Sequence, residues 1–162
     1  MPWGTPPFGP ADALLVVLIA IAVYTDVRTG KIKNWLTFPM MLAGCVLAPV
    51  LGAPWWTGLL GVALALLACL PFYALGRALY PGDVKMLMAA GALMGADAAV
   101  RATLFSVALI LPVGIVVLTV KRRWGNVPKV LRGEAPATTL FHAPVVGVAI
   151  LLARLQPWPE LW

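Results

Sequence analysis

The chain has 162 residues, of which 62% are hydrophobic and 11% are charged, and its mean hydropathy of +0.94 far exceeds that of an ordinary soluble domain. One transmembrane helix uses about 20 apolar residues, so this composition predicts a polytopic membrane protein and excludes a separate soluble catalytic domain. The formal charge of +6 is interpreted as a marker of membrane topology, and no nucleic-acid partner is expected. Cys45 and Cys69 both lie in apolar runs, which argues against a disulfide framework and a CxxC zinc site.

The apolar stretches predict an all-α fold of six transmembrane helices, at about residues 11–27, 35–51, 56–79, 84–95, 98–120 and 141–155. The fourth stretch is short enough to be a re-entrant or interfacial segment instead. Charge favours a crossing, because six spans leave only Arg101 and Arg154 of the twelve Lys and Arg residues on the second face. The positive-inside rule then places both termini outside. Residues 1–162 are predicted to form a single integral-membrane domain.

Two of the six acidic residues lie at the same predicted boundary. Asp26 closes the first helix and Asp83 opens the fourth, so both are expected at the cytoplasmic side and at similar depth. A carboxylate at membrane depth is costly unless it faces protein, water or a partner, which makes each a candidate functional group. Two alternatives remain open. Asp26 could pair with Arg28 or Lys31 at the interface, and Asp83 could be the N-cap of its helix.

Two carboxylates that share a proton titrate at separated pKa values, because repulsion between like charges disfavours ionising both. The ionised carboxylate can take a proton from an attacking water, while the protonated one hydrogen-bonds the developing oxyanion. This is the chemistry of an aspartic protease, and it needs no metal and no covalent intermediate. The sequence does not indicate which aspartate would be the base.

Residues 26–37 (DVRTGKIKNWLT) and residues 81–86 (PGDVKM) closely resemble the type IV prepilin peptidases, which are GxGD intramembrane aspartyl proteases. The resemblance is best with the short branch that serves Flp, or tight-adherence, pili. It implies that Asp26 and Asp83 are the two catalytic aspartates. The chain departs from the family pattern at two positions: Tyr80 stands where GxGD has its first Gly, and Lys33 stands where the loop motif usually has Pro.

The resemblance implies an endopeptidase in the bacterial inner membrane that cleaves the basic leader from Flp-type prepilins at the cytoplasmic face. Longer members of the family carry a module with paired CxxC motifs and a methyltransferase activity. This sequence has no such insertion, so no zinc, no S-adenosylmethionine and no other cofactor is expected. Two other functions remain open: a small proton-coupled or cation-coupled transporter that uses the same aspartates, and a non-catalytic pilus or secretion assembly factor. The oligomeric state is not predicted.

Four further residues are predicted to support the aspartates. Gly82 permits close backbone approach or a positive φ. Lys85 either lowers the pKa of Asp83 or reaches an anionic lipid. Asn34 is interpreted as the N-cap of the second helix, from where it would steady the loop that carries Arg28.

Three remaining residues have simpler interpretations. Gly91 and Gly95 form a G-x-x-x-G pair, which indicates a closely packed helix face. His142 is the only histidine, and it is interpreted as an interfacial residue rather than a general base because it has no metal partners or nucleophile beside it.

Overall fold

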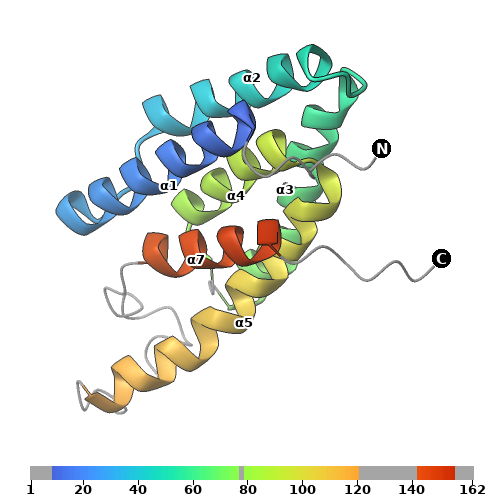
Figure 1. The fold of residues 1–162 in the computed structure, drawn as a ribbon. Helices are drawn as coiled ribbons and strands as arrows, with labels where there is room; N and C mark the ends of the chain where they lie inside the picture. The colour runs from blue at the N-terminus through green and yellow to red at the C-terminus, as the bar shows by residue number, and fades with distance from the viewer. Residues whose placement is uncertain (1–8, 77–78, 121–141, 156–162) are drawn as a thin grey trace.

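The computed structural model describes residues 9–76, 79–120 and 142–155, which form six helices and no strand (Figure 1). The predicted all-α class is therefore confirmed for this part of the chain. The basic loop that follows the fifth helix lies outside the described residues. The helices are α1 (Pro10–Thr29), α2 (Asn34–Val50), α3 (Trp56–Gly76), α4 (Pro81–Met94), α5 (Ala96–Val120) and α7 (His142–Leu155).

Among the described helices, α1 is long and apolar enough to cross a bilayer by length and composition. Shorter apolar helices are α2, α7 and the part of α3 from Trp56 to Phe72. Helix α4 has 14 residues, which at 1.5 Å per residue gives about 21 Å, less than a hydrocarbon core of about 30 Å. Helix length thus supports one span directly and leaves the six-span topology as a prediction.

The start of α4 differs from its prediction by three residues. The helix begins at Pro81, and Tyr80 is its N-cap with an extended backbone (φ −87°, ψ 159°). Proline suits the first position of a helix, because its missing N–H would have no partner there and its fixed φ is already helical. Asp83 consequently lies inside the first turn of α4.

Helix α4 is the centre of the bundle, and it contacts each of the other described helices (Figure 1). Nine of its 14 residues are buried. Most of the surface of α4 is therefore covered by neighbouring helices. Its first turn, which carries Asp83, is therefore positioned by tertiary packing from several sides.

Small residues let α4 approach its neighbours at backbone contact. A Cβ atom added to Gly61 of α3 would lie 1.9 Å from the carbonyl oxygen of Gly91, and one added to Gly44 of α2 would lie 2.6 Å from the carbonyl carbon of Ala92. The predicted close packing at Gly91 is confirmed. Gly95 has a different role, since it ends α4 with a φ of 88° and donates its N–H to the Gly91 carbonyl.

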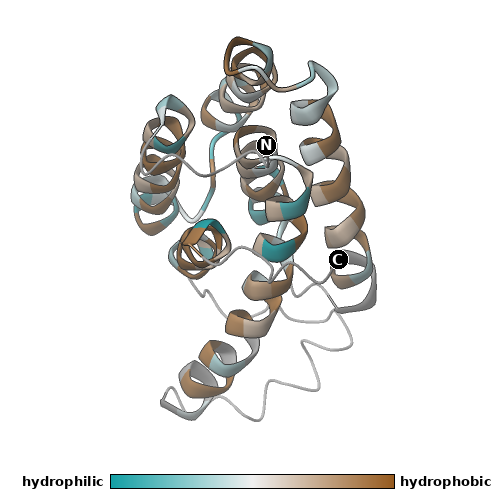
Figure 2. Ribbon diagram, turned by 45° about the vertical axis from the view of Figure 1, so that its right-hand side comes forward, coloured by the Kyte–Doolittle hydropathy of each residue, from teal (hydrophilic) through white to brown (hydrophobic). Residues whose placement is uncertain are grey.

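Large nonpolar side chains cover much of the outside of the bundle. On α2 they form one stripe at helical spacing, made by Trp35, Phe38, Leu42, Val46 and Val50. Figure 2 shows that hydrophobic colouring dominates the described helices. The interior also holds large nonpolar side chains, among them Leu15, Leu18 and Met86. Nonpolar faces left on the outside are expected when helices pack against one another in an apolar solvent.

Candidate active site

Asp26 lies in the last turn of α1, which ends at a glycine in the left-handed conformation. Gly30 has a φ of 62°, and its N–H donates to the carbonyl oxygen of Asp26 at 2.7 Å. Glycine adopts this conformation without the steric penalty that a Cβ would impose. The spacing between Asp26 and Gly30 therefore places the carboxylate one turn before the end of the helix. The carboxylate is buried, with 9% of the residue exposed.

Asp83 lies in the first turn of α4 and is 2% exposed. Its Oδ2 accepts a hydrogen bond from the backbone N–H of Tyr80 at 3.0 Å. Asp83 is thus the third residue of the helix, reaching back to the N-cap N–H in the manner of a capping box. The interpretation of Asp83 as the N-cap itself is wrong, because the helix starts at Pro81.

The structure brings the two carboxylates into electrostatic range of each other. Asp83 interacts electrostatically with both Asp26 and His142. The Oδ2 atom of Asp26 also accepts a hydrogen bond from the backbone N–H of Ala143 at 3.1 Å. The last turn of α1, the first turn of α4 and the start of α7 therefore meet at one end of the bundle.

His142 lies against the α4 N-cap. Its ring and that of Tyr80 make an edge contact, with centroids 4.8 Å apart and planes at 62°. The sequence predicts His142 as an interfacial residue without a link to the aspartates, and the structure supplies that link through Tyr80. One signal could have done so: the predicted topology already puts the start of the last helix on the same face as Asp26 and Asp83.

Lys85 and Asn34 contact each other, a partnership that the sequence does not predict. The Nζ atom of Lys85 donates to Oδ1 of Asn34 at 2.9 Å, which ties the first turn of α4 to the start of α2. Asn34 is the first residue of α2, and its predecessor Lys33 is the N-cap without a side-chain cap bond. The N-cap interpretation of Asn34 is therefore wrong. Its side-chain oxygen serves a tertiary contact instead of a backbone amide of its own helix.

Gly82 has no positive φ, so that part of the expectation is wrong; the positive φ values among the described glycines belong to Gly30, Gly52 and Gly95. A Cβ added to Gly82 would lie 3.4 Å from Cβ of Ile32, which is ordinary van der Waals contact. Gly82 therefore lies beside the loop that joins α1 to α2.

Arg28 is a supporting residue that the structure places away from the aspartates. Its side chain is exposed, and its guanidinium carbon lies 5.2 Å from the ring centroid of Tyr24 on the same helix. Residues two apart on a helix do not share a face, so Arg28 projects away from Asp26. Lys85 likewise lies two residues from Asp83 and contacts Asn34 of α2, so neither basic side chain is placed on its neighbouring aspartate.

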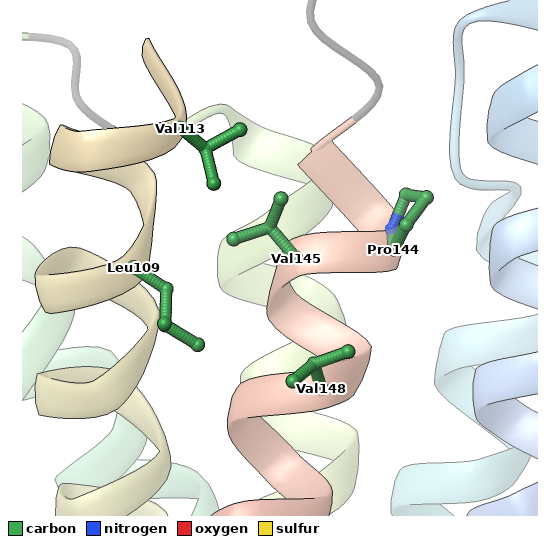
Figure 3. A pocket seen from close by; sticks show the side chains of 5 residues that line it. All are labelled: Leu109, Val113, Pro144, Val145 and Val148. Atoms are coloured by element: carbon green, nitrogen blue, oxygen red, sulfur yellow. The ribbon is translucent and has the colours of Figure 1, made fainter. Parts of the chain in front are cut away.

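Two nonpolar hollows border this end of the bundle. One of about 260 Å³ lies between α3 and α4, and it is lined by Leu66, Cys69, Leu70, Pro81, Val84, Lys85 and Met88. The other, of about 230 Å³, lies between α5 and α7, where Leu109 and Val113 face Val145 and Val148 beside Pro144 (Figure 3). Neither lining includes Asp26 or Asp83, so the hollows lie beside the helix ends that carry the site and not at the carboxylates.

Neither cysteine forms a disulfide, and Cys69 lines the hollow between α3 and α4. Both thiols are free, and the buried Cys69 lies 3.8 Å from the hydroxyl of Thr103. In the ranges that the structure describes, no group of three or more His, Cys, Asp or Glu side chains could hold a metal ion.

Comparison with known proteins gives one family. The model of the type IV leader peptidase family matches residues 13–115, a range that includes both aspartates and ends inside α5. Helix α7 lies beyond it. No curated protein and no solved structure matches the chain. The family match covers more than half of the sequence and confirms the resemblance seen in residues 26–37 and 81–86. The chain therefore belongs to the type IV leader peptidase family.

Proposed function

We propose that this protein is an intramembrane aspartic endopeptidase that removes the basic leader from Flp-type prepilins, with Asp26 and Asp83 as its catalytic pair. Membership of a leader peptidase family supports hydrolysis of a peptide bond. The observation that carries the aspartic mechanism is the pair of buried carboxylates, one ending α1 and one beginning α4, which the contacts of Ala143 with Asp26 and of His142 with Tyr80 bring to one end of the bundle.

The proposed reaction uses one carboxylate as the base and the other as the acid. The ionised aspartate takes a proton from water as the water oxygen bonds to the amide carbon of the leader. The protonated aspartate donates a hydrogen bond to the oxyanion that forms. The carbon–nitrogen bond then breaks as the departing nitrogen takes the proton that the first aspartate received from water, so that a carboxylic acid and an amine are released and that aspartate is ionised again. Backbone N–H groups of Ala143 and Tyr80 hold one oxygen of each aspartate, and the reaction uses the other oxygen.

The bilayer of a bacterial inner membrane is the proposed setting, with the aspartates at the cytoplasmic face. Exposed nonpolar side chains on the outer helix faces support contact with lipid. The excess of Lys and Arg on the face that the topology assigns to Asp26 and Asp83 supports the orientation. A prepilin substrate with a basic leader and an apolar helix would present its cleavage site at this depth.

The position of the aspartates favours hydrolysis over transport. Ion-coupled transporters bind their cations near the bilayer midplane, at helices interrupted within the membrane. Here the two carboxylates lie in a terminal turn of α1 and a terminal turn of α4. A scaffold without catalytic activity would tolerate loss of either carboxylate, which is the basis of the test.

The test is to purify Asp26→Asn and Asp83→Asn separately and measure cleavage of a prepilin, with the mature N-terminus sequenced. Asparagine keeps the shape and one acceptor oxygen but cannot take or give the proton. Each variant should lose about 10³-fold or more of kcat. Both should unfold in detergent micelles at the wild-type temperature or above, because removing a buried carboxylate removes its desolvation cost.

Asp97→Asn is the matched control. Asp97 also lies in the first turn of a helix, α5, but its side chain is 68% exposed and pairs with Arg101. This variant should cleave at the wild-type rate. Processing that survives either Asp26→Asn or Asp83→Asn would reject the catalytic pair.

A further inference from the structure

We infer that the start of α7 positions both aspartates, through the backbone N–H of Ala143 and the ring of His142. This inference rests on the proposed catalytic roles of Asp26 and Asp83. It adds two positioning residues from a helix that lies outside the range of the family match.

The first step is the contact with Asp26. The N–H groups in the first turn of a helix have no partner within the helix, and together they give that end a partial positive charge. In α7 one of these groups, the N–H of the fully buried Ala143, donates to Oδ2 of Asp26 at 3.1 Å. The bond fixes the orientation of the carboxylate, and the partial charge stabilises it without a cationic side chain that would hold it permanently ionised.

The second step is the contact with the N-cap of α4. The N–H of Tyr80 holds Oδ2 of Asp83, so the orientation of the Tyr80 backbone sets the direction of that carboxylate. The edge contact of the Tyr80 ring with the His142 ring attaches this backbone to α7. A glycine at position 80 would have no ring and a wider choice of backbone conformations. The Tyr80 ring therefore attaches the start of α4 to α7, a contact that the glycine usual at this position could not make.

Together the two contacts make α7 a common support. His142 and Ala143 are neighbours in the chain. His142 contacts Tyr80, which holds Asp83, and Ala143 holds Asp26, a residue 57 positions before Asp83. At its other end α7 is bound to α1 by the bond between Arg154 and Asp12. A shift of α7 would thus change the separation of the two carboxylates, and catalysis is sensitive to such shifts because reacting groups must be held in a narrow range of distance and angle.

The experiment measures kcat and KM of purified full-length variants on a prepilin in detergent micelles. His142→Ala removes the ring that faces Tyr80, and it should lower kcat by about tenfold with KM within about twofold of wild type. A fall in kcat at constant KM is expected when the catalytic groups are misplaced and the substrate contacts are intact. Thermal unfolding of each variant establishes that the fold is retained.

Conservative variants separate ring contact from general damage. His142→Phe and Tyr80→Phe keep a ring on each side, and both should stay within about threefold of wild type in kcat. Tyr80→Gly removes the contact from the α4 side without touching α7, so it remains informative if His142→Ala does not fold. The double variant Tyr80→Gly with His142→Ala should be no slower than the slower single variant, since both changes remove the same contact.

Phe38→Ala is the control for loss of an aromatic ring, because Phe38 is exposed on α2 and belongs to no part of the site; it should cleave as wild type does. Wild-type kcat in Tyr80→Gly, or a His142→Phe variant as slow as an alanine variant, would overturn the inference. Asp26→Asn and Asp83→Asn are assayed alongside. If they are inactive while Tyr80→Gly is fully active, the inference fails and the proposed function stands; if they are active, the proposed function itself fails.

Discussion

Helices α1 and α7 are hydrogen-bonded to each other at both ends, and the donors at the two ends differ in charge. At one end the guanidinium of Arg154 donates to both oxygens of Asp12, with Nε 2.5 Å from Oδ1 and a second nitrogen 3.0 Å from Oδ2. At the other end Asp26 accepts a backbone N–H from Ala143. A carboxylate held by a guanidinium fork is fixed as an ion and adds to stability. At Asp26 the donor is a neutral backbone N–H, which places no formal charge beside the carboxylate.

Asp12 and Asp83 occupy the same position in the first turns of α1 and α4. Each follows a proline at the first helical position, and each accepts the N–H of its N-cap, from Gly9 at 2.9 Å and from Tyr80 at 3.0 Å. The local motif is therefore shared. What separates the two is the tertiary partner, which is an arginine for Asp12 and the region of Asp26 and His142 for Asp83.

Among the charged side chains Arg154, Asp97 and Lys85, the largest effect on stability is expected at Arg154. Arg154→Met keeps a long nonpolar side chain but leaves the largely buried Asp12 without its ionic partner, which should lower the free energy of unfolding by about 2 kcal/mol. Unfolding in detergent micelles measures this loss. At temperatures where the variant is folded, cleavage should stay within about threefold of wild type, because the pair lies at the end of α1 opposite Asp26.

Asp97→Asn provides the matched comparison for a charge pair. Asp97 pairs with Arg101 within one helix; its own side chain is 68% exposed while that of Arg101 is 11% exposed. Asparagine keeps an acceptor oxygen for the guanidinium, so the change should cost about 1 kcal/mol or less. An Arg154→Met variant as stable as wild type would show that the joint of Asp12 and Arg154 contributes nothing. An Arg154→Met variant that cleaves as poorly as Asp26→Asn would show that the two ends of α1 do not have separate functions.

Much of this arrangement was predictable because it depends on local sequence. The run of nonpolar residues predicts the helices. The small residue Gly91 predicts close packing. The positions of Asp26 and Asp83, at helix boundaries on one predicted face, identify the candidate pair before any coordinates. Each of these features depends on residues that are close together in the chain, or on the topology predicted from the distribution of Lys and Arg.

The parts that were not predicted depend on partners distant in sequence. Asp26 and Ala143 are 117 positions apart, and Asp12 and Arg154 are 142 apart. A backbone N–H leaves no mark in the sequence, because every residue except proline has one. Asn34 was misassigned for a related reason: the preference of asparagine for N-caps is a local rule, and a tertiary contact with a lysine overrides it.

A smaller effect is expected where α4 is tied to α2. Lys85→Met removes the bond to Asn34, which lies at the surface, and should lower the free energy of unfolding by about 0.5 kcal/mol. Cleavage should fall by about threefold if the tie helps to hold the first turn of α4 in place. The measurement is the same pair of assays, unfolding in micelles and prepilin cleavage.

Lys31→Met is the control for loss of a positive charge at this edge, since Lys31 is exposed in the loop between α1 and α2. Asn34→Ala should reproduce the Lys85→Met result, and combining the two should add nothing. If Lys31→Met slows cleavage as much as Lys85→Met does, the charge acts on the leader or on lipid and the tie to Asn34 is irrelevant.

The smallest effect is expected at Gly82, and it bears directly on the likeness between the starts of α1 and α4. Ala11 of α1 stands at the position that Gly82 occupies in α4, between the proline and the aspartate. Gly82→Ala would make the two starts alike. The added Cβ would meet Ile32 at 3.4 Å, and alanine is favoured over glycine in a helix by about 1 kcal/mol, so stability should be unchanged or slightly higher.

Cleavage by Gly82→Ala should likewise stay within about threefold of wild type if the glycine serves only the fold. Gly61→Ala is the opposite case, because its Cβ would lie 1.9 Å from a backbone oxygen of α4 and should prevent normal packing. A Gly82→Ala variant that folds normally but no longer cleaves would contradict this prediction. The structure has room for this Cβ, so such a result would mean that a substrate backbone needs the same space. Gly82 would then belong to the substrate-binding surface.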